Sequence, residues 1–352
     1  MGATQKRRDG VFGNLYCLSV TLALFFTAVS ASFCPILAHI ENNVLGDLGA
    51  YFRPRNTESG GSVQYASYPA LFRSADDASN KKQKTYLRLI GTEYAVLLLA
   101  SALSDRAFKG PTFYLLYAFI FVVSVVLLLT RNLWKLQQDW YRCRALAESV
   151  KTLTWRYMMR GAPFVDGPPL QDARAEFRNQ LYKTFDANRA TADRIDPNWS
   201  ADDQITDEMD HIRALSLDER KKYYTVHRLN DQRTWYMRKA GENNRSARNW
   251  VIATVIAYTL AFALVLARIK FPDWEFWGIG PIIVFASSAI GWMQVMKFNE
   301  LAAAYTVTAH EIGLIKPKLD AVHAENDFSN FIADAELAFS REHTLWIARQ
   351  SK

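Results

Sequence analysis

The chain has 352 residues, of which 50% are hydrophobic and 13% aromatic, and its formal net charge is +7. This much apolar and aromatic surface excludes an intrinsically disordered chain, and 3 Cys in this length exclude a disulfide scaffold. The mean hydropathy of −0.11 is typical of a soluble protein, but it hides long stretches without charged residues, and those stretches decide the class.

The N-terminal region contains the first such stretch. Residues 10–38 are 29 residues without a formal charge, and they follow the basic run Lys6, Arg7 and Arg8. This pattern is typical of a signal peptide or of a further span. Three interpretations stay open: a cleaved signal with inverted topology of everything after it, an apolar tail that does not cross the membrane, or upstream sequence read from a mistaken start codon. We expect residues 1–64 to lie outside the functional core.

Four later stretches predict membrane-spanning helices. Three of them have 21, 19 and 21 residues without a charge, and the fourth has 18 residues with one Arg and one Glu. Each is close to the ~20 residues that cross the hydrocarbon core, whereas buried helices of soluble proteins are usually shorter. The four stretches are residues 110–130, 249–267, 276–296 and Leu87–Ser104.

The four stretches form two predicted hairpins, because the links of residues 105–109 and 268–275 are short. The second hairpin repeats the first about 160 residues later, and a helical pattern follows each one, over Arg131–Arg160 and Met296–Leu319. Glu148 and Glu311 stand at nearly the same offset in these two patterns. The sequence therefore predicts an all-α membrane protein made of two repeated transmembrane helical hairpins with long cytoplasmic helices.

The charged segments between and after the hairpins are also predicted to be helical. Arg131–Arg160 is expected to be one continuous helix with an apolar seam at a 3-4 spacing, which consists of Leu133, Leu136, Trp140, Cys143, Ala147, Val150 and Thr154. Residues 172–185 predict a further helix and residues 187–203 a loop. Ser216 and Glu219 fit a capping box, after which Arg220–Asn249 is expected to run without a break into the third span. The aromatic residues along it, Tyr223, Tyr224, Trp235 and Tyr236, fit either the membrane interface or a cytoplasmic bundle.

The distribution of basic residues predicts the orientation. The segments flanking the hairpins hold 15 Lys and Arg, against four in the two hairpin loops. The positive-inside rule therefore places the long segments and the C-terminus of a multi-pass membrane protein in the cytoplasm. The net charge fits an anionic lipid surface. Direct nucleic-acid binding is not expected, because the basic residues alternate with 35 acids and no nucleic-acid module is present.

No catalytic or metal-binding motif is present in the sequence, so we predict neither an enzyme nor a cofactor. His310 and Glu311 lack the second His of a zinc-protease helix, and there is no phosphate-binding glycine loop or nucleophile elbow. Cys17, Cys34 and Cys143 are most simply apolar fillers.

Polar side chains inside the predicted spans are the candidates for a pore-facing role. Glu93 is the only acid in a predicted span, so it is a candidate to face a water-filled path. The alternative is an interfacial Glu that snorkels or is neutralised by Arg88. The hydroxyl groups are weaker candidates, because such groups usually bond to backbone carbonyls. They belong to Ser101, Ser124, Thr254, Thr259, Ser287 and Ser288.

Small residues in the spans predict close helix contacts. Ala253, Ala257 and Ala261 follow an i,i+4 spacing in the third span, and Gly291 stands four residues after Ser287 in the fourth. Such residues let helix backbones approach each other. We interpret them as helix-packing surfaces that include contacts between subunits.

Two stretches carry a family resemblance. Residues 68–79, YPALFRSADDAS, lead into the first hairpin, and residues 140–157, WYRCRALAESVKTLTWRY, follow it. They resemble the SMODS- and SLOG-associating two-transmembrane effector (SLATT) domains of bacteria. The second half, from Ile205 through Trp235 to the second hairpin, resembles another subtype. This resemblance implies a first SLATT-like domain at 65–165, a linker and helix at 166–204, and a second such domain at 205–347.

The family implies a membrane effector of anti-phage systems that are linked to nucleotide second messengers. Such effectors are proposed to oligomerise and to form pores that kill or arrest the infected cell. A nucleotide-second-messenger synthase or a sensor protein is the implied partner, and a non-conducting membrane anchor or scaffold for a signalling enzyme is the alternative. The residues carried over to the motif helix are Arg144, Glu148, Lys151, Trp155 and Arg156. Their chemistry suggests packing and a polar network at the membrane exit.

Overall fold

A computed structural model describes residues 65–104, 110–165, 169–273 and 278–350, and every regular element in these ranges is helical. The expected N-terminal extension, residues 1–64, lies outside the described residues. The described residues belong to one compact unit. Four of the helices that the structure describes are long and apolar enough to cross a membrane, as the charge-free stretches predicted.

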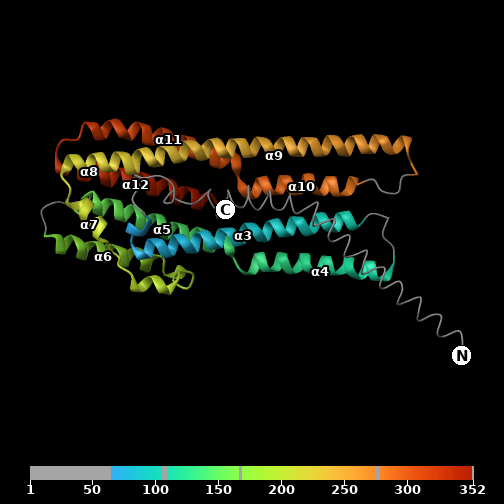
Figure 1. Ribbon diagram of the computed structural model, residues 1–352, viewed down its shortest axis with the longest axis horizontal. Coiled ribbons are helices and arrows are strands. Elements are labelled where there is room, and N and C mark those ends of the chain that lie inside the picture. The colour runs from blue at the N-terminus through green and yellow to red at the C-terminus, as the bar shows by residue number, and fades with distance from the viewer. Residues whose placement is uncertain (1–64, 105–109, 166–168, 274–277, 351–352) are drawn as a thin grey trace, which may run out of the picture. The chain divides into compact units, whose positions relative to one another are not determined.

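The two predicted hairpins are confirmed, and they have the same plan. In the first, α3 (Ala70–Leu103) packs against α4 (Pro111–Leu133), and α5 (Leu136–Met158) follows. In the second, α9 (Asp231–Lys270) packs against α10 (Ile279–Met296), and α11 (Phe298–Asp320) follows. In both repeats the first helix is long enough to run through the apolar end and into the charged end of the unit (Figure 1).

The expected continuous helix Arg131–Arg160 is wrong. It is divided into α4 and α5, and Lys135 between them has a left-handed backbone with φ 46°. The second repeat has the same break, because Lys297 between α10 and α11 has φ 49°. These breaks could not be predicted from the sequence. Left-handed positions usually carry Gly, Asn or Asp, but both positions here are Lys, and neither has a Gly or Pro beside it.

The remaining helices belong to the charged end, which we call the body. They are α6 (Leu170–Ala187), α7 (Asp207–Ala214), α8 (Leu217–Tyr224) and α12 (Glu325–Gln350), with short 3-10 turns at Tyr65–Ser67, Arg189–Thr191 and Pro197–Ala201. The capping box of Ser216 and Glu219 is present at the start of α8. The π-helical turn η5 (Thr225–Asn230) joins α8 to α9 without a break, as expected.

The hydrophobic core of the body draws on both repeats. Its fully buried side chains include Trp155 of α5, Phe177 of α6, Ile312 of α11 and Phe328 of α12. The predicted seam of α5 is buried from Leu136 onward and packs on α3, whereas Leu133 is 70% exposed at the end of α4. The two repeats are therefore joined by a common core.

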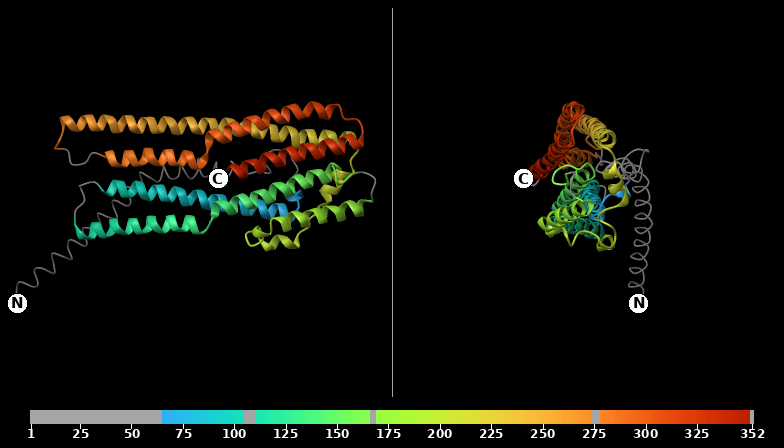
Figure 2. Two further views of the ribbon diagram at one scale, coloured as in Figure 1. Left: turned by 180° about the vertical axis from the view of Figure 1, so that it is seen from behind. Right: turned by 90° about the vertical axis from the view of Figure 1, so that its left-hand side faces the viewer.

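The apolar ends of the helices have a different arrangement. Here α3 contacts α4 and α10, and α10 contacts α9, so the spans follow the order α4, α3, α10, α9. Figures 1 and 2 show α4 at one edge of this array and α9 at the other. Among the described elements, α4 and α9 therefore have the outermost positions.

Candidate functional site

A chain of buried charges runs along the motif helix α5. Arg144 places Nη1 2.9 Å from Oδ1 of Asp76 on α3 and Nη2 2.6 Å from Oε1 of Glu148. Lys151 lies one turn further, with Nζ 3.7 Å from Oε2 of Glu148. Asp76, Arg144 and Lys151 are all buried, so each charge depends on these partners. The spacing 144, 148 and 151 puts the three α5 side chains on one helix face.

Burial changes the ionisation of this chain of charges. It raises the pKa of the Asp76 carboxyl above its ordinary value, although the Arg144 guanidinium opposes the change. It lowers the pKa of the Lys151 amine, against the attraction of Glu148. Both shifts disfavour the charged form, which is the expected cost of taking an ion out of water. The ion pairs therefore offset the desolvation cost of the buried charges. Removing one partner leaves the other charge buried without compensation.

A second buried ion pair lies where the two repeats meet. Arg228, on the π-helical turn, donates from Nε to Oε1 of Glu336 at 2.8 Å and from Nη2 to Oε2 at 2.6 Å. Tyr224 donates to the same carboxylate at 2.9 Å. Glu336 is fully buried on α12, and Arg228 is 3% exposed. A bidentate pair of this geometry fixes both orientation and distance.

Trp155 connects this second pair to the first repeat. The Arg228 guanidinium lies 5.6 Å from the centre of the Trp155 ring and 4.8 Å from that of Phe339. The Trp155 indole N–H donates to the hydroxyl of Tyr68 at 3.1 Å. Arg228 therefore binds Glu336 within its own repeat and contacts an aromatic ring of the other. π-helical turns commonly mark functional positions, because they turn one side chain out of the regular helical register.

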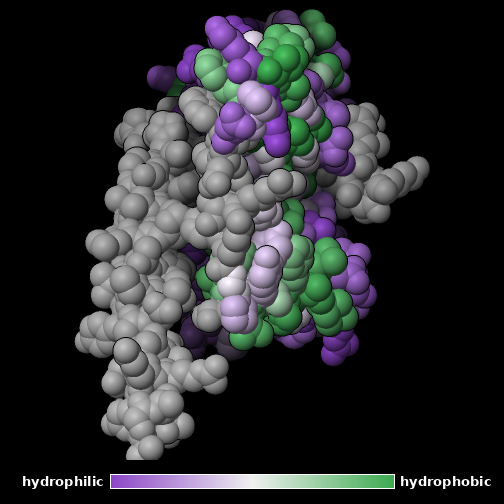
Figure 3. Space-filling model, turned by 90° about the vertical axis from the view of Figure 1, so that its right-hand side faces the viewer, coloured by the Kyte–Doolittle hydropathy of each residue, from purple (hydrophilic) through white to green (hydrophobic). Residues whose placement is uncertain are grey.

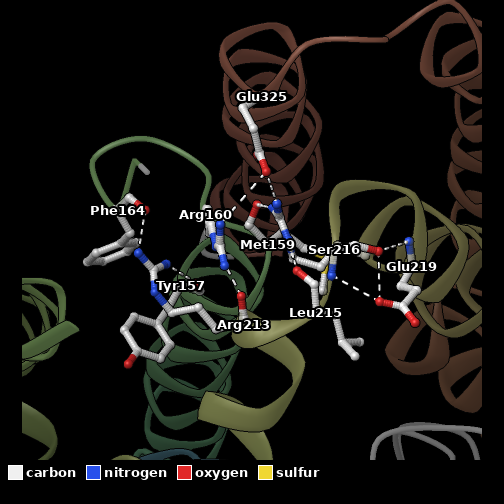
Figure 4. A network of polar contacts seen from close by, with 10 residues as sticks. Tyr157, Met159, Arg160, Phe164, Arg213, Leu215, Ser216, Glu219 and Glu325 are labelled. Carbon is white, nitrogen blue, oxygen red and sulfur yellow. Dashed lines mark hydrogen bonds and ion pairs between the residues drawn. The ribbon is translucent and has the colours of Figure 1, made fainter. Parts of the chain in front are cut away.

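The end of α5 that is farthest from the spans is capped by arginines of α7 and α8 (Figure 4). Arg213 donates to the carbonyl oxygens of Tyr157 at 2.7 Å and of Phe164 at 3.0 Å. Arg220 donates to the carbonyl oxygen of Met159 at 3.1 Å. The last carbonyls of a helix lack partners within the helix, so these cations complete their hydrogen bonding and complement the helix dipole.

The same arginine cluster contacts the start of α12. Glu325 forms ion pairs with Arg220 and, at 3.8 Å, with Arg160, whose own Nε donates to the carbonyl oxygen of Arg213 at 3.0 Å. Figure 4 shows these groups converging from α5, α7, α8 and α12. Through the ion pairs of Glu325 and Glu336, α12 is therefore linked both to the end of the first repeat and to the start of the second.

The other motif residues also have structural partners. Trp155 is 1% exposed in the common core, and Arg156 donates to the carbonyl oxygen of Ala162. The predicted motif residues therefore belong to the network of buried contacts that holds the helices of the body together. Within the ranges described, no group of three or more His, Cys, Asp or Glu is placed to hold a metal ion.

The candidate polar residues of the spans occupy different surroundings. Glu93 forms an ion pair with Arg131 of α4 at 3.0 Å, so its partner is this residue and not Arg88. Ser101 faces α10, where a Cβ at Gly280 would lie 3.2 Å from its hydroxyl. The hydroxyls of Ser124 and Thr254 donate to carbonyls four residues earlier in their own helices.

The remaining hydroxyl candidates lie on outer surfaces or are half-buried. Thr259 is exposed and also donates within its own helix, to the carbonyl oxygen of Val255 at 2.9 Å. Ser287 is exposed and Ser288 is half-buried on α10. Within one chain the candidates therefore do not line a common path.

The small residues lie where helices approach each other. Ala257 and Ala261 are both 7% exposed on α9, which packs against α10, while Ala253 is half-buried. A Cβ at Gly291 would come within 2.5 Å of the Tyr94 hydroxyl, so this glycine makes room for α3 beside α10. Contacts between subunits at these positions stay a prediction.

For four residues of these networks the sequence predicted neither the burial nor the ion-pair partner. Asp76 lies within the first motif stretch but carried no mark of its partner on α5, which is 68 residues away. Arg228, Glu336 and Arg220 are single charges in polar segments. Only their burial and their pairing distinguish them from surface residues, and neither is visible in a single sequence.

Both repeats match models of one family. Residues 69–221 match SMODS and SLOG-associating 2TM effector domain 3, and residues 224–346 match SMODS and SLOG-associating 2TM effector domain 1. The chain is a tandem SLATT-domain protein. It is therefore a multi-pass membrane protein whose two domains belong to a family of membrane effectors associated with SMODS and SLOG systems.

The remaining comparisons add no further likeness. No curated protein and no solved structure matched the sequence. SLATT is not a known catalytic family. The domain bounds 65–165, 166–204 and 205–347 stay a prediction.

Proposed function

We propose that this tandem SLATT protein is an oligomeric effector of the bacterial inner membrane in a nucleotide-signal-linked anti-phage system. When triggered, it forms a pore or otherwise perturbs the membrane and so kills or arrests the infected cell. It is not an enzyme and needs no cofactor in this role. The observation that carries the proposal is that membrane-spanning helices continue directly into a body held together by buried ion pairs.

Two of the spans are rigidly connected to the body. α3 is one helix of 34 residues that contains both Asp76, in the body network, and Glu93, in the span. The helix of 54 residues from Leu217 to Lys270 contains Arg228 and the whole third span. A change in the body network therefore moves the far ends of these helices.

The other two spans are joined to the body through short non-helical breaks. Lys135 and Lys297 have left-handed backbones at these joints. Hinges are commonly a few terminal residues of an element that absorb a change in φ and ψ. The proposed transition keeps α3 and α9 fixed to the body helices while α4 and α10 change their angle at the two lysines.

The signal enters on the cytoplasmic side in this proposal. The positive-inside rule favours a cytoplasmic body, since the segments flanking the hairpins hold 15 Lys and Arg against four in the hairpin loops. A nucleotide-second-messenger synthase or a sensor protein is the proposed partner that acts on the body. A ligand or partner shifts the equilibrium only if it binds the open arrangement more tightly than the closed one.

The rival function is a non-conducting anchor for a signalling enzyme, and one observation favours it. The span hydroxyls of Ser124, Thr254 and Thr259 bond to their own helices, and Glu93 has an ionic partner. No common polar path is thus formed by these residues within one chain. A pore would have to be completed by several copies or by a movement of the spans.

Membrane potential in infected cells distinguishes the two functions. Cells that carry the protein with its genomic neighbours are infected with phage. Before lysis, the membrane potential is followed with a potential-sensitive dye, and membrane leakage is followed by the uptake of an impermeant dye. The pore proposal expects depolarisation that Glu93→Gln or Ser124→Leu alters. Protected but fully polarised cells would reject the pore, and equal protection by both variants would support the anchor.

A further inference from the structure

The contact between the two repeats in the membrane joins unlike helices. It is formed by α3, the first helix of its repeat, and α10, the second helix of the other. Gly280 and Gly291 of α10 make room for Ser101 and Tyr94 of α3 at this contact. The pairing α4 with α9, which a two-fold axis would add, is not among the main helix contacts of the described residues. The repeats are therefore related head to tail.

A head-to-tail contact leaves one complementary surface free at each edge. The free surfaces here belong to α9, which corresponds to α3, and to α4, which corresponds to α10. In the most apolar stretch of α4 only 6% of the residues are buried, against 22% in that of α10. Figure 3, seen from the hairpin-loop end, has hydrophobic side chains on the outer surface both at the top, where Figure 1 places α9, and at the bottom, where it places α4.

The left-handed lysines give the register between the repeats. Lys135 and Lys297 occupy the same joint and lie 162 residues apart. With this offset the apolar stretches of the two repeats overlap for most of their length, since residues 110–130 correspond to residues 272–292, which share residues 276–292 with the charge-free stretch 276–296, and residues 87–104 correspond to residues 249–266. The repeat relation therefore assigns a counterpart to each residue of the contact between α3 and α10.

On α4 the counterparts of the two contact glycines face outward. Ala118 corresponds to Gly280 and is exposed, and Leu129 corresponds to Gly291 and is 50% exposed. Neither position lies among the buried residues of the hairpin interior. α4 thus presents, at its outer edge, the surface that α10 uses toward α3.

On α9 the counterparts of the α3 contact residues are also exposed. Ile256 corresponds to Tyr94 and is 62% exposed, and Ala263 corresponds to Ser101 and is exposed as well. The paired side chains stay uncharged at both positions. Tyrosine against glycine becomes isoleucine against leucine, and serine against glycine becomes two alanines, so the second position again pairs two small residues that let helix backbones approach.

We infer that α9 is the docking surface for α4 of a second copy of this chain. The contact repeats the packing of α3 against α10, so it brings Ala263 to Ala118 and Ile256 to Leu129 of the neighbour. The inference rests on the proposed function only in so far as both require an oligomer. Because the contact is heterologous, each added copy offers a new free edge, and the assembly grows until a ring closes.

The body provides a matching pair of edges. Two large side chains on α6, Leu170 and Tyr182, are 46% and 68% exposed, and α6 lies on the same side of the molecule as α4 (Figure 1). On the helices of the opposite side, Val307 and Leu314 of α11 are 56% and 73% exposed, and Met237 of α9 is 57% exposed. Large exposed apolar side chains on a water-facing surface favour contact with a partner. A head-to-tail neighbour covers one set with the other.

Cysteine cross-linking in native membranes tests this contact. Two differently tagged full-length copies are expressed together, with Cys17→Ser, Cys34→Ser and Cys143→Ala in each to remove background. One copy carries Ala118→Cys and the other Ala263→Cys. A second pair uses Leu129→Cys and Ile256→Cys. We expect a dimer that carries both tags from each pair, and a ladder beyond the dimer when one chain carries both cysteines.

Matched variants control the chemistry and the helix face. Ser101→Cys with Gly280→Cys in one chain tests the known contact and should link within the monomer. Ala261→Cys, two residues from Ala263 but buried on the inner face of α9, should not link to Ala118→Cys.

The outcomes are separable from those of the pore experiment. If the intrachain control links while both intermolecular pairs fail, before and after phage infection, the contact is wrong. If Ala118→Cys of one copy links only to Ala118→Cys of another copy, the dimer is symmetric, and the proposed head-to-tail contact is wrong. If both pairs link but the membranes stay sealed after infection, the contact between copies is supported and the pore proposal is rejected.

Discussion

The two repeats share a plan, but they differ in what their third helices enclose. α5 buries Arg144, Lys151 and Asp139, whereas the buried residues of α11 include no charged side chain. The glutamates at matching offsets show the same contrast. Glu148 lies between two cations of the buried network, while Glu311 is exposed on α11.

The position of each helix explains this difference. α5 is covered by α3, α6, α7 and α12, whereas α11 contacts α9, α12 and η5. A charge is retained in the interior only where partners from several helices meet it, because an unpaired buried ion is costly. α5 therefore lies at the centre of the body, whereas α11 lies closer to its edge.

The largest expected effect on the free energy of unfolding comes from removing the central cation, Arg144, from the α5 network. Arg144→Met removes the direct ion-pair partner of the buried Asp76, and loss of one partner of a buried pair costs about 3–5 kcal/mol. Thr306→Met is the matched control, because Thr306 is the exposed counterpart of Arg144 on α11 and should stay within about 0.5 kcal/mol. Unfolding in detergent micelles measures both. Equal effects would mean that the two repeats do not differ in this respect.

The two glutamates provide a milder form of the same comparison. Glu148→Gln removes the charge between Arg144 and Lys151 but keeps a polar group, and hydrogen bonds to charged groups contribute about 1.5–3 kcal/mol. Glu311→Gln should be nearly neutral, because Glu311 is exposed. The same unfolding measurement applies, and a comparable loss in Glu311→Gln would show that α11 also carries an essential charge.

The contact between the repeats in the membrane can be tested by overpacking. Gly291→Leu forces a side chain into the space of Tyr94, and such insertions cost about 1–3 kcal/mol. Gly241→Ala on α9 has open space around its Cβ and should be neutral or stabilising by up to about 1 kcal/mol. Cross-linking of Ser101→Cys to Gly280→Cys reports whether α3 and α10 separate. An unchanged link and unchanged stability in Gly291→Leu would place the contact elsewhere.

The smallest effect is a pH dependence of Lys151. Burial lowers the pKa of this amine in the folded state, so the unfolded chain binds its proton more readily. The Lys151 contribution to stability is therefore least favourable at neutral pH and improves as pH rises toward the ordinary lysine value of about 10.4. The free energy of unfolding of the wild type, relative to Lys151→Met, should rise between pH 7 and pH 10. A constant difference would contradict the shift.

The sequence was sufficient for the elements whose signals are local. Runs of about 20 residues without charge fixed the spans, and Ser216 with Glu219 fixed the start of α8. The 3-4 spacing identified the buried face of α5 from Leu136 onward. Each of these signals lies within one or two dozen residues.

Features that depend on distant partners were not predictable. The break at Lys135 has no marker residue, and its side chain gives no sign of the left-handed backbone. Asp76 meets Arg144 across 68 positions, and Arg228 meets Glu336 across 108. Such pairs arise from the packing of α5 and α12 between the repeats, which no local pattern encodes.

The central claim is that the charged body holds the spans in a sealed arrangement, and the membrane potential of uninfected cells tests it most directly. Glu336→Gln breaks the bidentate pair with Arg228, while Glu311→Gln leaves the network intact. Both variants are checked for equal amounts in the membrane before the potential is read. The account predicts depolarisation by Glu336→Gln without any trigger and a normal potential in cells with Glu311→Gln. A normal potential in both, with Glu336→Gln folded and membrane-inserted, would contradict it.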